Sequence, residues 1–214
     1  MAADDTSSGW LLFLAQLPGS PSSARVALWR RLRTIGAAGI LNGAWALPYT
    51  SSHARFFKQM QDTVRSQGGK VFVMAVPESS PDTDAMIVER FRADRGREYD
   101  ELIERCGAFL AELSKETRAC KFTFAELEEN EQELEKLTRW LAKIQARDFF
   151  PDERQPQAQR LAGRCQQTLE AFSRGVYQAE GIEPPPGPAA AEDDGWDASS
   201  QEQMPGIGAG SSDS

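Results

Sequence analysis

Apolar residues in the front part of the chain follow two alternating patterns. Short apolar runs that end at proline or glycine are typical of buried strands, and such runs predict four strands, at residues 10–17, 39–41, 44–47 and 70–76. Between them, apolar residues at three- and four-residue spacing predict two amphipathic helices, one at 24–35 and one that starts at Thr50–Ser52 and ends near Ser66. Asn42-Gly43 favours a tight hairpin, because both positions tolerate positive φ.

The order of these elements predicts the fold class. Strand-helix-strand-strand-helix-strand is the order of the ferredoxin-like fold, in which two helices cover one face of a four-stranded sheet. We expect Trp29 to be buried against this sheet and Trp45 to be buried between the sheet and a helix or the helical region. Six elements in about 70 residues make a small core. We therefore expect the domain to be stabilised by packing against the neighbouring helical region or against a second copy of the chain, in a homo-oligomer.

After residue 81 the apolar spacing is helical throughout. Stripes at residues 99–113, 127–144 and 161–176 predict two or three amphipathic helices in an antiparallel hairpin or bundle. From Glu183 onward the chain has five prolines and no Lys or Arg, a composition typical of disorder. We therefore expect an α+β protein with four parts: a disordered N-terminus (1–8), a ferredoxin-like domain (9–80), a helical region (81–180) and a disordered tail (181–214).

Charge is divided sharply along the chain. Eight basic side chains and one acidic side chain give residues 20–76 a net charge of +7, whereas residues 77–214 carry −13. Such asymmetry indicates a front part with an anionic partner. Attraction between the two halves explains the same pattern, and the sequence leaves both explanations open. The acidic run 126–135 is interpreted as the solvated face of a helix.

Seven basic side chains on the two helices of the sheet domain form a candidate nucleic-acid surface. Both helices are expected on the same sheet face, so these side chains could line one basic surface and contact DNA phosphates. The alternative is that several of them form ion pairs with the acidic helical region or with another subunit. The candidates are Arg25, Arg30, Arg31, Arg33, Arg55, Lys58 and Arg65.

The starts of the same two helices form a weaker candidate site, for an oxyanion. Free backbone amides, hydroxyl groups and a nearby cation occur together there. The residues are Ser22 and Ser23 at the first helix and Ser51 and His53 at the second. Ordinary N-capping explains the same residue types and is the more common role.

No catalytic or metal-binding pattern is present in the sequence. His53 is the only histidine, the three cysteines are widely spaced, and neither a GxSxG nor an HExxH motif occurs. We therefore expect no enzymatic activity, no cofactor and no metal site, and small buried or half-buried thiols. The longest apolar runs are far shorter than the ~20 residues of a membrane-spanning helix. Acidic residues precede the first run, so we expect a cytoplasmic protein without a membrane partner.

Several segments of the front half resemble the N-terminal domain of the bacterial chromate-resistance regulators of the ChrB family. These are a serine-started Arg-x-x-x-Trp-Arg-Arg-Leu helix at 22–33, then Gly-Ala at 36–37, then a strand at 42–48 that ends in Leu-Pro. Residues 91–99 continue the likeness, which covers about residues 9–150. The resemblance implies a role in chromate-inducible transcription. Longer members carry a second domain where this chain has its Pro/Gly-rich acidic segment, so chromate as a direct effector stays open.

Two functions from different classes follow. In the first, the protein is a ChrB-like regulator that acts in transcription by binding DNA through the basic helices. In the second, it is an adaptor that dimerises through its sheet or helices, with the basic residues paired to its own acidic helices. Arginines bonded to residues 126–135 would favour the adaptor, whereas an uncompensated arginine surface would favour the regulator.

Overall fold

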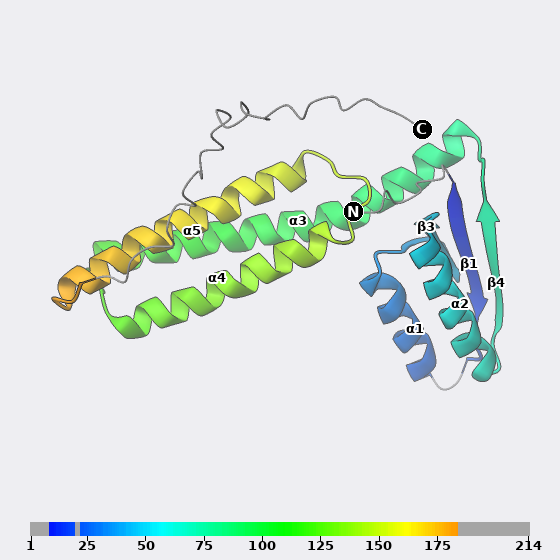
Figure 1. Ribbon diagram of the computed structural model, residues 1–214, viewed down its shortest axis with the longest axis horizontal. Helices are drawn as coiled ribbons and strands as arrows, with labels where there is room; N and C mark the ends of the chain where they lie inside the picture. Colours follow the sequence, from blue (N-terminus) through cyan, green and yellow to red (C-terminus); the bar gives the residue numbers. More distant parts are fainter. Residues whose placement is uncertain (1–8, 20–21, 184–214) are drawn as a thin grey trace, which may run out of the picture.

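The computed structural model describes residues 9–19 and 22–183, which form a four-stranded antiparallel sheet and five helices (Figure 1). The elements in chain order are β1 (Trp10–Gln16), α1 (Ser22–Thr34), β2 (Ala38–Leu41), β3 (Ala44–Pro48), α2 (Ser51–Ser66), β4 (Lys70–Val76), α3 (Pro81–Arg118), α4 (Phe124–Gln145) and α5 (Arg154–Ala179). The predicted α+β class is confirmed. The predicted disorder of residues 1–8 and 184–214 falls outside the described residues, and Gly181 and Ile182 form the turn that ends α5.

The sheet has the strand order β2-β3-β1-β4. β1 is central and pairs with both β3 and β4, so that Leu12 lies opposite Ala46 on one side and opposite Met74 on the other. The hairpin between β2 and β3 is confirmed, and Gly43 has a φ of +75°. A Cβ at Gly43 would lie 2.5 Å from the carbonyl oxygen of Ala15, so both conformation and space require glycine there. The ferredoxin-like topology stays a prediction.

Helices α1 and α2 cover one face of the sheet (Figure 1). Alternate residues of a strand point to opposite faces, so Leu11 and Phe13 of β1 point towards these helices. They form a buried core with Leu32 of α1 and Phe57 of α2. Trp10 points to the other face, where it packs against α3.

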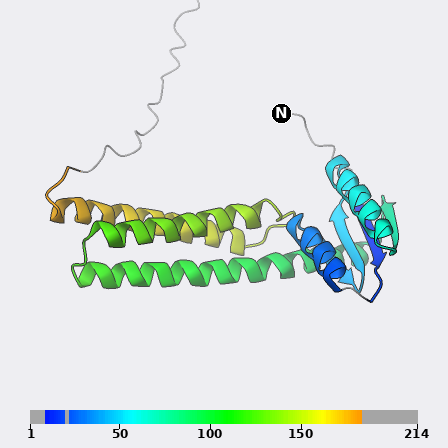
Figure 2. The same ribbon diagram turned by 90° about the horizontal axis from the view of Figure 1, so that it is seen from below.

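Helix α3 links the sheet to the helical region (Figure 2). It begins at Pro81 with the Ser80 hydroxyl as its N-cap, an arrangement suited to proline because the first helical N–H needs no partner within the helix. Its first part packs Ile87 and Phe91 against the sheet beside Trp10. Its second part forms a bundle with α4 and α5. The predicted helical bundle is therefore confirmed, and in the described part of the chain it consists of α3, α4 and α5.

The bundle core contains two of the three cysteines. Cys106 of α3 and Cys165 of α5 are buried, and the Sγ of Cys165 lies 3.6 Å from the carbonyl oxygen of Cys106. Cys120 is exposed just after α3 and has a φ of +51°. The prediction of small buried thiols therefore holds for two cysteines and is wrong for Cys120.

The predicted burial of Trp29 is wrong, because its side chain is 51% exposed. Leu32 is the residue that α1 buries completely, and at about 100° per residue Trp29 lies on the flank of the helix, beside the buried stripe. It borders a shallow groove of about 360 Å³ that Trp45 also lines. Trp45 is half-buried and packs against the core under α1 and α2.

We expect the stability of the sheet domain to depend on Phe13 and not on Trp29. Phe13→Ala removes a fully buried ring, and such a truncation typically costs ~3–5 kcal/mol of unfolding free energy. Trp29→Ala removes a half-exposed ring and should cost less than about 1 kcal/mol. Urea unfolding followed by circular dichroism measures both values. A loss for Trp29→Ala as large as that for Phe13→Ala would contradict the exposed position of Trp29.

Candidate functional site

Three arginines of α1 project from the helix-covered side of the sheet. Arg25, Arg30 and Arg31 are exposed, and none has a carboxylate within 4.0 Å among the residues that the structure describes. Arg30 precedes the buried Leu32 by two residues, so it points away from the sheet. These side chains are available to an external partner.

Three basic residues of α2 continue this surface. Arg55, Lys58 and Arg65 are exposed and form no ion pair within residues 9–19 and 22–183. α1 and α2 lie side by side on the sheet (Figures 1 and 2), and Asp62 is the only acidic residue on either helix. Arg25 lies two turns before the buried Leu32, on the same face of α1, and borders the groove that Trp45 lines. Six of the seven predicted candidates are thus exposed on α1 and α2 without an ion pair in the described residues. This basic face comprises Arg25, Arg30, Arg31, Arg55, Lys58 and Arg65.

Arg33 is the exception among the candidates. Its Nη1 lies 3.4 Å from Oδ2 of Asp94, and its Nη2 lies 3.7 Å from Oε1 of Glu98, both on α3. Its guanidinium also lies over the ring of Trp29, 5.7 Å from the ring centroid, which is within the range of a cation–π contact. Arg33 therefore ties α1 to α3 and is not part of the basic face.

The carboxylates that hold Arg33 belong to a buried group of charges. Asp94 is only 3% exposed, and the neighbouring Arg95 is buried as well. Nη1 of Arg95 lies 3.1 Å from Oε1 of Glu98, and Nη2 of Arg147 lies 2.7 Å from Oε2 of the same carboxylate. Arg147 also donates to the backbone oxygen of Arg33 at 3.4 Å. We call these five residues the ion cluster.

The ion cluster joins α1, α3 and the segment that follows α4. Burial is the main cause that lowers the pKa of Arg95 from its ordinary value, and the Glu98 carboxylate counteracts it. Within α3, Asp94 also pairs with Arg90 and Arg97, but its two carboxylate oxygens accept no hydrogen bond. Buried charges need partners, and the pairs that Arg33 and Arg147 add form only when all three elements are docked. Gly36 permits their close approach, because a Cβ there would lie 2.9 Å from the Cβ of Arg147. The ion cluster was not predicted from the sequence. The four-residue spacing of Asp94 and Glu98 is the one local feature that could have indicated it.

The acidic run 126–135 takes no part in these contacts. Its ion pairs are local: Nζ of Lys121 lies 3.3 Å from Glu126, and Nζ of Lys136 lies 3.0 Å from Glu133. Most of its acidic side chains are exposed, which confirms the interpretation as a solvated helix face. Among the described residues, no arginine of α1 or α2 is bonded to this run.

The oxyanion candidates are separated by the length of the sheet. Ser22 and Ser23 begin α1 after the last residue of β1, whereas Ser51 and His53 begin α2 near the first residue of β1 (Figure 1). Thr50 caps α2, and its hydroxyl accepts from the backbone N–H of His53 at 3.1 Å. The two pairs therefore do not form one site.

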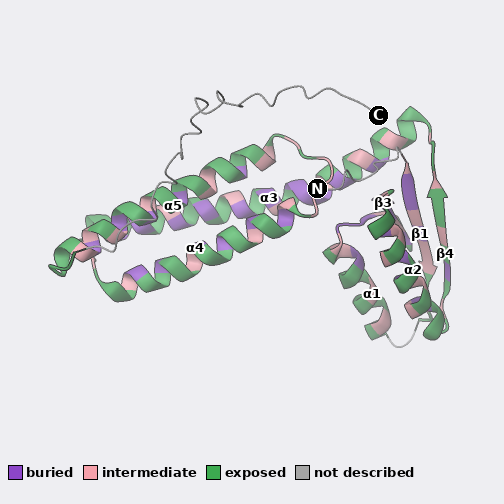
Figure 3. Ribbon diagram, in the orientation of Figure 1, coloured by how far each residue is buried: buried purple, intermediate pink, exposed green. Residues whose placement is uncertain are grey.

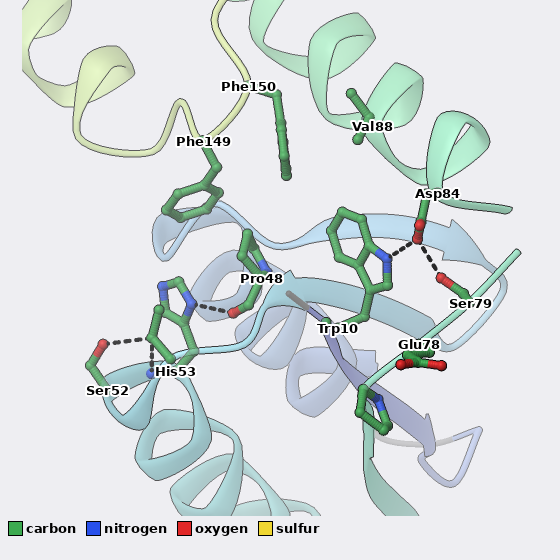
Figure 4. Close-up of a pocket in the computed structure, with 13 residues that line it drawn as sticks. Trp10, Pro48, Ser52, His53, Glu78, Ser79, Asp84, Val88, Phe149 and Phe150 are labelled. Carbon is green, nitrogen blue, oxygen red and sulfur yellow. Dashed lines mark hydrogen bonds between the residues drawn. The ribbon is translucent and has the colours of Figure 1, made fainter. Parts of the chain in front are cut away.

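A cavity of about 750 Å³ lies beside the start of α2 (Figure 4). Trp10, Phe149 and Phe150 supply its apolar wall. His53 also lines it; this ring is buried, and its Nδ1 lies 2.8 Å from the backbone oxygen of Pro48. The cavity thus brings together the start of α2, the start of β1 and the segment after α4.

Carboxylates on the other side of this cavity disfavour an anion. Nε1 of Trp10 donates to Oδ1 of Asp84 at 2.6 Å, and the Ser79 hydroxyl donates to the same oxygen. The bond from Ser79, and then that from Trp10, lowers the pKa of Asp84, so this carboxyl is ionised at neutral pH. Glu78 lines the cavity too, and no Lys or Arg does so among the described lining residues. An oxyanion role for Ser51 and His53 stays a prediction.

Two further features concern the described residues as a whole. No group of three or more His, Cys, Asp or Glu side chains in these residues is placed to hold a metal ion. Of the helices in the same ranges, none is both long enough and apolar enough to cross a membrane.

Known proteins similar to this chain point to one family. Residues 25–182 match the family described as Protein ChrB, N-terminal. The chain belongs to this family. Protein ChrB of Cupriavidus metallidurans is 28% identical over 154 residues, which cover 71% of this chain and 44% of that relative. The chain thus spans less than half the length of the relative it matches.

The family match includes all but the first turn of α1 and every later element up to α5. It begins at Arg25, beyond β1, and extends past the predicted limit near residue 150 to Ile182, just after α5. The basic face and the ion cluster both lie inside the matched region. The link to the chromate-resistance family that the sequence implied is therefore confirmed at the level of the family.

The ion cluster predicts unequal roles for neighbouring arginines of α1. Arg33→Ala leaves the buried Asp94 carboxylate with fewer partners and should lower the unfolding free energy by about 1–3 kcal/mol. Arg31→Ala removes an exposed, unpaired side chain and should change it by less than about 0.5 kcal/mol. Guanidinium-chloride unfolding compares the two variants. Equal effects would show that Arg33 does not hold α1 to α3.

Proposed function

We propose that this ChrB-family protein is a non-enzymatic regulator of the bacterial chromate response that acts in transcription by binding DNA through the basic face. The observation that carries the proposal is the set of six exposed basic side chains on two adjacent helices, none of which has an ion-pair partner in the described part of the chain. Unpaired cations on one side of a protein bind DNA because each neutralised phosphate releases counterions.

The geometry of the basic face suits a phosphate backbone. Arg30 and Arg55 each lie two residues from a buried residue of their own helix, Leu32 and Phe57, and therefore point straight out from the sheet. α1 and α2 are 13 and 16 residues long, so each extends for about 20 Å. Duplex DNA carries a charge every ~1.7 Å along its axis, and a surface of this length faces several phosphates.

The position of Trp29 supports the same surface. Trp29 lies four residues after Arg25 and four before Arg33, on the flank of α1, and its ring is half-exposed. A flat aromatic ring next to cations offers apolar contact to sugars while the cations contact phosphates. The exposure of the Trp29 ring, which contradicts a role in the core, is consistent with a role at a DNA interface.

A dimerisation or adaptor module that does not bind DNA is the second candidate. One observation favours it: Arg33 is bonded to Asp94 and Glu98 of the protein's own helical region. In this case the basic face would meet an acidic protein surface, and DNA binding would be absent at any salt concentration.

DNA binding should depend on the basic face and not on total charge. Arg30→Ala/Arg31→Ala/Arg55→Ala should weaken binding to a DNA duplex and flatten the plot of log Kd against log salt by about one unit per lost phosphate contact. Arg33 stays intact, because its loss would loosen α1. Fluorescence anisotropy between about 50 and 200 mM salt measures both effects.

A matched control removes the same charge elsewhere. Arg105, Arg160 and Arg164 are exposed on α3 and α5, and none forms an ion pair within the described ranges. Arg105→Ala/Arg160→Ala/Arg164→Ala should bind DNA nearly as the wild type does. No binding by the wild type at about 50 mM salt, where electrostatic complexes are strongest, would reject the regulator and favour the adaptor. Equal losses in the two variants would reject the basic face as the contact surface.

A further inference from the structure

One face of the sheet is partly uncovered. α1 and α2 cover the opposite face. α3 covers one end of this face, where Ile87 and Phe91 pack with Trp10 of β1, Ala38 of β2 and Ala46 of β3. Away from that contact lie Phe72 and Met74 of β4, which are 66% and 45% exposed. Figure 3 shows β4 largely in the colour of exposed residues. Large apolar side chains therefore face solvent on a flat sheet surface.

The strand register shows that this surface is continuous and apolar. Phe72 lies opposite Leu14 of β1, and Leu14 lies opposite Ala44 of β3. Ala44 in turn lies opposite Leu41 of β2, which is 77% exposed. Residues opposite each other in regularly paired strands share a face, so Phe72, Leu14 and Ala44 form one apolar row across three strands. The register of β2 shifts between Gly39 and Leu41, so the row is regular only as far as β3. With Met74 of the neighbouring pair, the free face comprises Leu14, Phe72 and Met74, whereas Leu12, opposite Met74, packs against the cluster under α3.

We infer that the free face is a homodimer interface and that its partner is the free face of a second copy of this chain. The four strands contain one charged residue, Lys70, at the first position of β4. The free face therefore offers no set of charges to DNA, to a charged peptide or to an oxyanion. Lys70 shares this face but lies at its edge, opposite Gln16, and is exposed to water there. The apolar remainder has no charge to leave unpaired and can pack against its own copy, as a two-fold interface requires. This inference goes beyond the proposed function and does not rest on it.

The size of the free face fits a weak, reversible dimer. Four strands about 4.8 Å apart, with up to seven residues at about 3.3 Å each, make a face of roughly 400 Å², and α3 covers part of it. Exposed apolar patches of a few hundred Å² mark interaction sites, whereas a standard interface buries about 800 Å² on each partner. We therefore expect a dimer Kd in the micromolar range.

Such a dimer leaves both basic faces open. Two packed sheets lie about 10 Å apart, and in each copy α1 and α2 lie on the side of the sheet that faces away from the partner (Figure 1). Dimer formation and DNA binding therefore use opposite sides of the same sheet, and substitutions can affect one without the other.

Sedimentation velocity of the full chain tests the inference. Between about 1 and 500 μM, the wild type should shift reversibly from the 23.6 kDa monomer towards twice that mass. Phe72→Glu/Met74→Glu should raise the dimer Kd by about 100-fold or more, because the interface would bury carboxylates without partners. Both side chains are exposed in the monomer, so circular dichroism and thermal melting should show a retained fold.

A matched control places the same charge far from the sheet. Phe124 and Ile182 are exposed apolar residues at the far end of the bundle, and Phe124→Glu/Ile182→Glu should dimerise as the wild type does. A wild type that stays monomeric at about 500 μM overturns the inference. The inference is also overturned if the Phe72→Glu/Met74→Glu variant still dimerises, or if both variants lose the dimer to the same extent. The Phe72→Glu/Met74→Glu protein keeps its basic face, so its DNA binding reports on the proposed function separately.

Discussion

Helix α3 carries one long apolar stripe that no single partner in this fold can bury. Around Phe91 the stripe is covered by the sheet and by the segment after α4: the Phe91 ring lies 5.9 Å from the rings of Trp10 and Phe149 and 5.3 Å from that of Phe150. From Tyr99 onward the same stripe is covered by α4 and α5. Because one continuous helix serves both partners, it fixes the position of the sheet relative to the bundle (Figure 2).

Between its two apolar parts, α3 buries charge. Asp94, Arg95 and Glu98 lie where the contact with the sheet ends and the bundle begins. Buried ion pairs add little net stability, because desolvation offsets the attraction, but a partner left alone is costly. Arg33 reaches these carboxylates only in one rotation of α1 about its axis, and that rotation leaves Arg30 turned to solvent. The ion cluster therefore orients the basic face without belonging to it.

The features with local causes could be predicted from the sequence. Each strand ends near a proline or glycine, the Asn42-Gly43 turn tolerates positive φ, and the bundle helices repeat their apolar residues every three or four positions. The exposure of Trp29 could not be predicted, because its neighbour Leu28 fits the same stripe and tertiary contacts decide which of them faces the core. The ion cluster and the cavity at Trp10 join residues far apart in the chain, and apolar spacing carries no information about such contacts.

The structure adds a third explanation for the unequal charge of the two halves. The acidic run 126–135 is largely exposed on α4 and pairs with Lys121, Lys136 and Arg139 nearby, not with the basic face. Charges at a protein surface act over a Debye length of about 8–10 Å at moderate salt, and α3 carries most of α4 well away from α1 and α2 (Figure 2). The positive and negative fields therefore act on different parts of the molecule and do not cancel. Under the proposed function, the acidic bundle repels phosphates and directs a duplex to the side where the basic face lies.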